Sequence, residues 1–232
     1  MFKIKFLSAS MLVATSMAAS ALSSCALAEN AVVVPPAVMM EPVTGAGMEK
    51  VVLAGGCFWG VQGVFQHVKG VVNAVSGYDG GKGDTANYET VSGGQTGHAE
   101  SVEITFDPAI INYATLLQIY FSVVHNPTEL NYQGPDSGMQ YRSAIFPQSE
   151  AQAQVAQAYI DQLNKAKAFK APIVTTIEPA KNFFPAEDYH QDYLTLHPTE
   201  GYIAANDIPK VQDLSKFFPD IYSEKPKLVK GS

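Results

Sequence analysis

The most constraining feature of this chain is a strand, a glycine turn and a helix that follow one another directly. Residues 50–54, Lys-Val-Val-Leu-Ala, are typical of a buried strand, and Gly55-Gly56 end it. Cys57 follows, and beyond it apolar residues recur at helical spacing until Gly70. These apolar positions are Phe58, Val61, Val64, Phe65 and Val68. The sequence therefore predicts a βα unit with Cys57 at the start of the helix.

The rest of the chain predicts an α+β domain with several strands and helices. Residues 101–106 alternate polar and apolar side chains, and Glu100 has the parity of the apolar face, which is unusual for a carboxylate. Ser149 and Gln152 form a capping box for a helix that we expect to reach about Phe169. Further strands are predicted at 71–78, 141–146 and 173–178, and a further helix at 113–124. Beyond residue 178 the proline-rich chain shows little regular pattern and is expected to wrap the domain.

The first 28 residues have the composition of an export signal. Lys3 and Lys5 give a basic start, an uncharged apolar stretch follows, and 26–28 (Ala-Leu-Ala) offer a cleavage site. A retained membrane anchor is the alternative, which the shortness of the apolar stretch disfavours. We expect residues 29–48, which contain three prolines, to be a flexible linker before a folded domain at 49–232.

A second processing site competes with this cleavage. Leu22-Ser23-Ser24-Cys25 is similar to the bacterial lipobox, in which the cysteine is lipidated and becomes the first residue. A lipid on Cys25 would tether the protein to a membrane, and Ala26 after it is typical of sorting to the outer membrane. Both alternatives place the protein outside the cytoplasm, in the periplasm or as an outer-membrane lipoprotein.

The cysteine count adds a further constraint. The chain has two cysteines, and either form of processing leaves Cys57 as the one thiol of the domain. No internal disulfide can form, so stability must come from packing, for which 47% hydrophobic residues are ample. A single thiol kept in an oxidising compartment is a candidate reactive group, the alternative being a buried structural cysteine. The net charge of −7 and the lack of a basic cluster argue against nucleic acid as a partner.

The neighbours of Cys57 favour the reactive interpretation. Free N–H groups at a helix start stabilise a thiolate, and the preceding glycines leave the sulfur open. Phe58 and Trp59, the only tryptophan, suit an apolar pocket for a group such as S-methyl, although both rings also suit plain core packing.

Several motifs of the chain resemble methionine sulfoxide reductase A. They are GGCFWG at 55–60, GQTGHAE at 94–100 and QYRSAI at 140–145, with further matches at Gly77-Tyr78, Asn87-Tyr88, AEDYHQ at 186–191 and Gly201-Tyr202. The resemblance covers about residues 49–205 in the order of the family. It implies that 49–232 form a catalytic reductase domain, with a two-layer, ferredoxin-like mixed sheet and a long irregular C-terminal segment.

The resemblance also implies the reaction, which is reduction of methionine S-sulfoxide, free or in proteins, to methionine. Cys57 would attack the sulfoxide sulfur. Glu100, its pKa raised by desolvation, would protonate the leaving oxygen, unless it is a solvated carboxylate at a strand end. Tyr88 and Tyr141 match tyrosines whose hydroxyls bind the sulfoxide oxygen.

Other residues receive secondary roles from the resemblance. Asp136 matches a carboxylate that orders the site, although an ordinary turn aspartate is the alternative. Phe58 and Trp59 would hold the methyl group. His98 either supports the site or is a packed structural histidine, and the histidines show no metal-ligand spacing, so no metal is expected.

The C-terminal region lacks a resolving cysteine, because Gly201-Tyr202 is followed by Ile203, where many relatives place one. Once oxidised to a sulfenic acid, Cys57 has no second thiol in its own chain with which to condense. We therefore expect a monomeric one-cysteine enzyme without a bound cofactor that depends on an external thiol. A thioredoxin-like protein, glutathione or a similar donor would supply that thiol, and the substrates would be oxidised exported proteins.

Two other functions stay open at this point. A cysteine hydrolase or acyl transferase would use Cys57 with His98 or His190 as base, and would turn over without a reductant. A non-catalytic surface lipoprotein would merely bind methionine-rich partners. The missing resolving thiol favours the second alternative, whereas the presence of Cys57, Glu100 and both tyrosines disfavours it.

Overall fold

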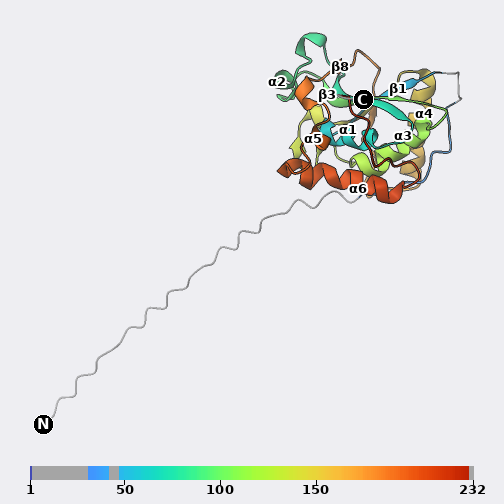
Figure 1. The fold of residues 1–232 in the computed structure, drawn as a ribbon. Coiled ribbons are helices and arrows are strands. Elements are labelled where there is room, and N and C mark those ends of the chain that lie inside the picture. Colours follow the sequence, from blue (N-terminus) through green and yellow to red (C-terminus); the bar gives the residue numbers. More distant parts are fainter. Residues whose placement is uncertain (2–30, 42–46, 230–232) are drawn as a thin grey trace.

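A six-stranded sheet organises the domain in the computed structural model, which describes residues 1, 31–41 and 47–229 (Figure 1). The order across the sheet is β7-β6-β1-β3-β2-β8; β6 and β7 pair in parallel and the other neighbours are antiparallel, so the sheet is mixed, as expected. The strands are β1 (Glu49–Gly55), β2 (Val71–Asp79), β3 (Ala99–Phe106), β6 (Ser143–Phe146), β7 (Thr176–Ile177) and β8 (Phe184–Pro185). A separate hairpin pairs β4 (Tyr132–Gln133) with β5 (Asp136–Ser137).

The four central strands have the ferredoxin-like arrangement. Helix α1 (Phe58–Gln66) connects β1 to β2, and α3 (Tyr113–Ile119) connects β3 to β6. This gives the chain order β-α-β-β-α-β with the sheet order β6-β1-β3-β2, a split β-α-β fold. The predicted α+β class and the predicted βα unit at Cys57 are therefore confirmed.

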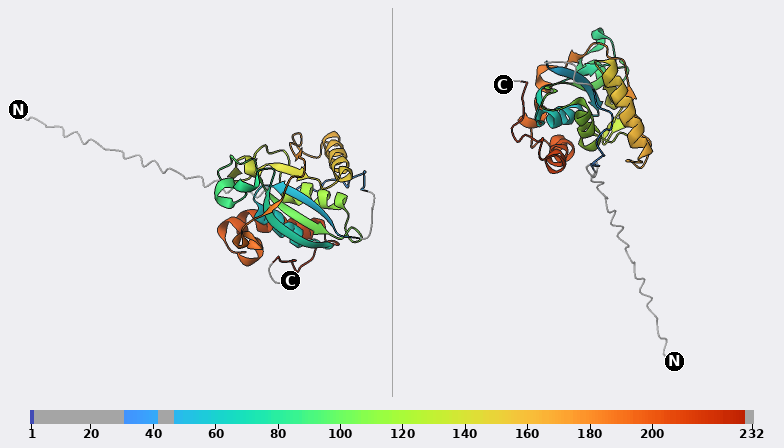
Figure 2. Two further views of the ribbon diagram at one scale, coloured as in Figure 1. Left: turned by 90° about the horizontal axis from the view of Figure 1, so that it is seen from above. Right: turned by 90° about the vertical axis from the view of Figure 1, so that its right-hand side faces the viewer.

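The helices lie on one side of the sheet, where α1 packs directly against β1, β2 and β3. α1 and α3 lie between α6 (Ile208–Phe217) and α4 (Glu150–Lys165), as the right-hand view of Figure 2 shows. Alternate residues of the strands, such as Leu53 and Val102, which face each other across β1 and β3, join the helices in one large core. The opposite face is smaller, and a partly buried Phe183 packs against it. Its buried residues are Val52, Ala54, Ala99, Ala144 and Phe146.

Helix α4 begins where the sequence places it, with one difference in its capping. The Ser149 side chain accepts the Gln152 N–H at 3.1 Å, which is the expected N-cap bond. The Gln152 side chain does not return to Ser149. It accepts the Gln148 N–H at 2.9 Å and donates to the Lys50 carbonyl at 3.0 Å, so that it ties α4 to β1 instead.

Several expected boundaries are wrong. The strand predicted at 141–146 begins at Ser143, because Met139–Tyr141 form a 3-10 turn after Gly138, whose φ of 140° suits glycine. The strand predicted at 173–178 shrinks to β7. The C-terminal segment is less irregular than its prolines suggest, because it contains α5 (Tyr193–Leu196) and α6, and a proline in the first turn of α6 is compatible with a helix start. None of the helices in the described residues is both long and apolar enough to cross a membrane.

The described part of the expected linker is also different from a flexible tether. Residues 31–41 form an N-terminal strap on α3 and α4, in which Val34 is 1% exposed. The Val34 N–H donates to Ser122 Oγ at 3.2 Å, and the Tyr159 hydroxyl donates to the Pro35 carbonyl at 2.6 Å. The strap is held because its carbonyls and N–H groups find partners on two helices. The rest of 29–48 before the strand lies partly outside the described residues, as does the whole predicted signal after Met1.

The strap makes a testable contribution to stability. Val34→Ala should lower the free energy of unfolding by about 2 kcal/mol, because it removes two buried methyl groups and leaves a cavity. Val38→Ala, at a residue that is 84% exposed on the same strap, should change it by less than about 0.5 kcal/mol. Urea unfolding measures both, and equal small effects would show that the strap does not pack in solution.

Candidate active site

Cys57 lies at the junction of β1 and α1, as the N-cap residue of the helix. Gly56 has a φ of 86°, a backbone conformation that favours glycine. A Cβ at this position would also lie 2.7 Å from the Gln133 Cβ, so the close packing of Gln133 excludes any larger residue. The Cys57 side chain is 8% exposed. The strand end thus delivers one nearly buried thiol to the first turn of a helix.

Glu100 meets this turn from the neighbouring strand. Its Oε2 accepts the N–H of Phe58, the first residue of α1, at 3.1 Å. The carboxyl group is 2% exposed, and this burial raises the pKa of Glu100 to about 8, with the nearby Asp136 and Asp207 adding to the rise. Glu100 therefore carries a proton at neutral pH and is not the solvated carboxylate of the alternative interpretation.

The expected effect of the helix start on Cys57 is outweighed. Burial raises the pKa of the Cys57 thiol well above its usual range, and the carboxyl groups of Glu100 and Asp207, once ionised, raise it further. The Trp59 N–H and the Lys210 ammonium act in the opposite direction but are weaker. The free-energy cost of burying a thiolate here exceeds the stabilisation that one backbone N–H provides. The resting group is therefore the neutral thiol.

The two predicted tyrosines lie on separate segments of the chain. Tyr88 opens the short helix α2 (Tyr88–Val91), and Tyr141 ends the turn before β6. Burial raises the pKa of both phenols, and Glu100 and Cys57 raise each pKa further once they are ionised. Both hydroxyls are therefore protonated hydrogen-bond donors close to these two groups.

Arg142 holds the Tyr141 turn in place. Its guanidinium makes a bidentate pair with Glu178, through bonds of 2.8 and 2.9 Å, and donates to the Gly97 carbonyl at 3.2 Å. The chain just after Tyr141 is thereby fixed to the glycine-rich segment just before Glu100.

Asp136 joins the site through a residue to which sequence reasoning gave no role. It accepts a short hydrogen bond from the Tyr202 hydroxyl, and its charge raises the pKa of Glu100. The charge of a Cys57 thiolate in turn raises the pKa of Tyr202, after the larger effect of burial. Asp136 is therefore part of the cluster and not an isolated turn aspartate. The Gly201-Tyr202 motif is the signal that could have identified Tyr202.

The two aromatic residues after Cys57 have different surroundings. Phe58 is 1% exposed and packs in the core, so the packing interpretation is correct for most of its ring. Trp59 is half-buried and stacks on Tyr193 with ring centroids 4.0 Å apart. Its Nε1 donates to His190 Nδ1 at 3.1 Å. His190 also packs on Phe58, with 5.0 Å between the ring centroids, and so fixes both rings.

Glu187 is a second residue that sequence reasoning gave no individual role. Its Oε1 accepts the Tyr88 N–H and its Oε2 accepts the Tyr78 hydroxyl, both at 2.9 Å. These bonds attach the start of α2 to the sheet and so place Tyr88. The AEDYHQ motif, which contains both Glu187 and His190, was the available signal.

Two further buried histidines, His98 and His125, are structural. His98 accepts the Gly81 N–H at 3.2 Å through Nδ1, and its Nε2 bonds the Lys82 carbonyl at 2.9 Å, so it orders that loop. His125 bonds Ser143 Oγ at 2.6 Å, and burial lowers its pKa to about 3. In the part of the chain that the structure describes, no three His, Cys, Asp or Glu side chains are placed to hold a metal ion.

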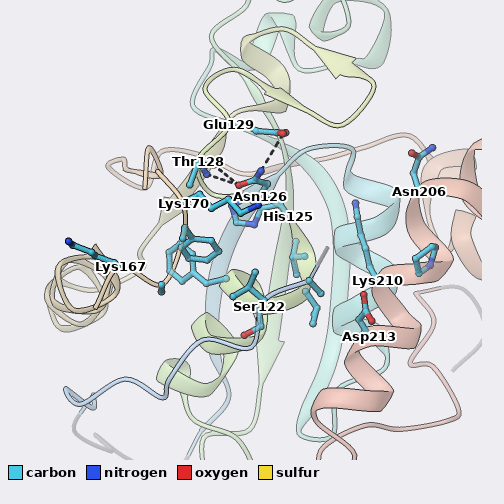
Figure 3. Close-up of a pocket in the computed structure, with 18 residues that line it drawn as sticks. Ser122, His125, Asn126, Thr128, Glu129, Lys167, Lys170, Asn206, Lys210 and Asp213 are labelled. Atoms are coloured by element: carbon cyan, nitrogen blue, oxygen red, sulfur yellow. Dashed lines mark hydrogen bonds between the residues drawn. The ribbon is translucent and has the colours of Figure 1, made fainter. Parts of the chain in front are cut away.

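A cavity of about 640 Å³ lies beside this region (Figure 3). Lys210 and Asp213 of α6 face it from one side. Asn126 and Glu129, in the loop before β4, face it from another. Cys57, Glu100 and the site tyrosines do not line it. The cavity is thus separate from the cluster around the thiol.

The arrangement defines a class of protein. A thiol and a protonated carboxyl group meet at one helix start, and two phenols lie within electrostatic reach of both. This set fits an oxidoreductase in which a thiol attacks an electrophile and an acid protonates the oxygen that leaves.

Comparison with known proteins names the family. The family model described as peptide methionine sulfoxide reductase matches residues 49–221. A peptide methionine sulfoxide reductase MsrA 2 of Mesorhizobium japonicum is 65% identical over 190 residues, which cover 82% of this chain and 97% of the relative. An MsrA 2 of Synechocystis is 50% identical over 84% of this chain and 91% of its own length.

Solved structures agree with these relatives. The reduced form of Mxr1 from Saccharomyces cerevisiae has a TM-score of 0.61 at 31% identity, over 73% of this chain and 96% of that one. Methionine sulfoxide reductase A of Corynebacterium diphtheriae has a TM-score of 0.57 at 34% identity, over 67% and 77%. The chain belongs to the peptide methionine sulfoxide reductase A family. It is an oxidoreductase that reduces methionine sulfoxide and thereby repairs proteins.

The protonated state of Glu100 predicts a pH-dependent stability. The folded protein keeps this proton up to about pH 8, whereas an unperturbed glutamate releases it near 4.5. The contribution of protonated Glu100 to the free energy of unfolding is therefore complete below pH 4.5. It is lost as the pH rises toward 8, by up to about 1.4 kcal/mol per pH unit. Glu100→Gln mimics the protonated acid and should gain stability relative to wild type from pH 5 to 8, as measured by urea unfolding. Parallel stability curves for the two proteins would contradict the assigned protonation.

Proposed function

We propose that Cys57 reduces methionine S-sulfoxide by taking its oxygen as a sulfenic acid, which an external thiol then reduces. The observation that carries this proposal is the meeting of the Cys57 turn and the protonated Glu100 at the Phe58 N–H. A nucleophile and an acid are thereby held at one point, where the sulfoxide sulfur and its oxygen would lie.

The first half-reaction follows from the protonation states. The Cys57 sulfur bonds to the sulfoxide sulfur, Glu100 gives its proton to the oxygen, and the thiol proton restores Glu100. The oxygen then passes to the Cys57 sulfur, and both the sulfur–oxygen bond of the substrate and the bond between the two sulfurs break, which yields methionine and a cysteine sulfenic acid. The hydroxyls of Tyr88 and Tyr141 donate to the oxygen, and their raised pKa values keep them protonated.

The other residues position these groups. Asp136 orders the site through Tyr202, and Phe58 and Trp59 hold the methyl group of the substrate. The second half-reaction requires two external thiols. The first forms a mixed disulfide with Cys57 and releases water, and the second displaces Cys57 as a thiol. A thioredoxin-like protein, glutathione or a similar thiol donor supplies these equivalents, and the enzyme works as a monomer without a bound cofactor.

The two alternative functions receive less support. A cysteine hydrolase needs a base beside the thiol, but among the described residues His98 bonds loop carbonyl and amide groups and His190 bonds Trp59. A purely binding lipoprotein would not require an acid whose burial keeps it protonated beside a thiol.

The proposed reaction is tested by single turnover with the purified protein and no reductant. One methionine per enzyme should form, together with a Cys57 sulfenic acid that dimedone traps and mass spectrometry detects. Cys57→Ser should abolish both, and Glu100→Gln should slow sulfenic acid formation by about 100-fold or more, a usual loss for an acid catalyst. Multiple turnovers should return with dithiothreitol.

The outcomes separate the roles. Methionine formation by Cys57→Ser would exclude Cys57 as the nucleophile. Unchanged kinetics of Glu100→Gln would exclude Glu100 as the acid. Phe183→Leu, on the opposite face of the sheet, serves as a matched substitution that should leave the single-turnover rate near that of wild type.

The proposed location is outside the cytoplasm, in the periplasm or as an outer-membrane lipoprotein tethered through Cys25. The composition of residues 1–28 supports this proposal, with repair of oxidised exported proteins as the consequence. The mass of the mature N-terminus in exporting cells tests it. A chain that starts at Glu29, or at a lipidated Cys25, is expected, and an intact Met1 would exclude export by either route.

A further inference from the structure

Asp207 is a buried acid to which the proposed reaction gives no role. It ends the π-helical turn Ile203–Asp207 and is the N-cap residue of α6. An aspartate at this position normally accepts an N–H of its own helix, but the Asp207 side chain makes no such bond. The side chain is fully buried and lies against Gly60 of α1, where even a Cβ would collide with its Oδ1. Asp207 thus places its carboxylate beside another helix and leaves its own helix uncapped.

The bonding of this carboxylate is incomplete. Oδ1 pairs with the Lys210 ammonium at 3.2 Å. Oδ2 is buried and accepts no hydrogen bond from the part of the chain that the structure describes. A buried carboxylate with an unsatisfied oxygen lowers the stability of the folded protein. A structural tie between α1 and α6 therefore does not account for an acid at this position, because an apolar side chain would pack there at a lower cost.

The position of the carboxylate relates it to the thiol. Gly60 follows Cys57 by three residues, so both lie on one side of the first turn of α1. The free N–H groups of this turn stabilise a negative charge, and Asp207 already supplies one. Its oxygen is closer to the helix than the counterion is, because a Cβ at Gly60 would lie 2.9 Å from Lys210 Nζ but would overlap the oxygen. Burial and Glu100 raise the pKa of Cys57 most, and Asp207 then raises it by more than Lys210 lowers it.

We infer that Asp207 acts through Cys57: its carboxylate, held by Lys210 beside the first turn of α1, slows the reaction of the resting thiol with soluble hydroperoxides. In that reaction the thiolate sulfur takes the terminal oxygen of the hydroperoxide as the O–O bond breaks, and a sulfenic acid forms. The other oxygen leaves as an anion and gains the proton that the thiol released. The inference rests on the proposed role of Cys57 and adds protection of the same thiol from oxidation without substrate.

Other ionisable groups surround Asp207 and Cys57, and a test must leave them in place. They are Lys210 of α6, Glu100 of β3, Asp136 of β5, Glu200 before the π-helical turn, and the phenols of Tyr88, Tyr141 and Tyr202. Asp207→Asn retains all of them and the shape of the side chain. It removes one negative charge, so a change in the ionisation of Cys57 can be assigned to that charge.

The test measures the rate at which iodoacetamide alkylates Cys57 as a function of pH in the full-length protein. Mass spectrometry of the peptide that contains Cys57 separates its signal from that of Cys25. Asp207→Asn should move the midpoint of the pH profile to lower pH by about one unit. Oxidation of Cys57 by hydrogen peroxide at neutral pH, followed with dimedone, should become about threefold faster. The larger fraction of thiolate outweighs its lower nucleophilicity. A looser fold would instead change the alkylation rate at every pH and leave the midpoint in place.

Asp213→Asn is the matched control, since Asp213 is an acid of the same helix that faces the cavity in Figure 3 and is not among the groups that shift the pKa of Cys57. It should leave both the profile and the peroxide rate unchanged. Asp207→Ser, which is smaller and also neutral, is a second variant that fits beside Gly60, and it should move the midpoint in the same direction.

The outcomes are separable from those of the proposed function. Neutral variants of Asp207 that fold, as urea unfolding measures, but keep the wild-type midpoint would overturn the inference, and so would a midpoint at higher pH. An equal shift in Asp213→Asn would also overturn it, because the effect would then not depend on the position beside α1. Failure of the wild-type protein to form methionine in a single turnover would instead contradict the proposed function, whereas the alkylation profile would still report on Asp207.

Discussion

The hydrogen bond from the Phe58 N–H to Glu100 is the contact on which the site depends. It requires the end of β1 to lie beside the start of β3. The pairing of Leu53 with Val102 sets this register. A shift of one residue would turn Glu100 to the other face of the sheet. It also requires α1 to start directly after β1, because a helix start presents free N–H groups. The nucleophile and the acid are therefore positioned by sheet register and helix start together.

Burial gives this contact its chemical character. Glu100, Asp136 and Asp207 lie near one another with Lys210 as a compensating cation, which pairs with Asp207 at 3.2 Å. In a buried environment, the free energy needed to ionise all of these neighbouring carboxyl groups is high. The pKa of Glu100 therefore rises, and Glu100 keeps its proton. The same conditions raise the pKa of Cys57. Both groups are therefore neutral at rest, a thiol beside a protonated acid.

The sequence predicted the parts of this arrangement that are local. Period-two and helical patterns identified β1, α1, β2 and β3, and the parity of Glu100 correctly indicated the buried face. Contacts between distant segments were not predictable from pattern. Tyr202 reaches Asp136 across 66 positions, and the N-terminal strap of residues 31–41 reaches Ser122 and Tyr159 with no period of its own. The helix α6 was missed because Pro209 in its first turn and its short apolar stripe resemble loop composition.

Cys57 is the one cysteine in the part of the chain that the structure describes, and this has a consequence for the order of events in the proposed mechanism. Cys57 is only 8% exposed and is flanked by Phe58 and Trp59, so little room surrounds its sulfur. A thiol donor must approach that sulfur in line with the bond it breaks. Substrate and donor would therefore compete for the same small opening, and methionine would have to leave before reduction begins. For the mechanism proposed above, reaction through Cys57 alone therefore favours two separate half-reactions with the oxidised enzyme between them.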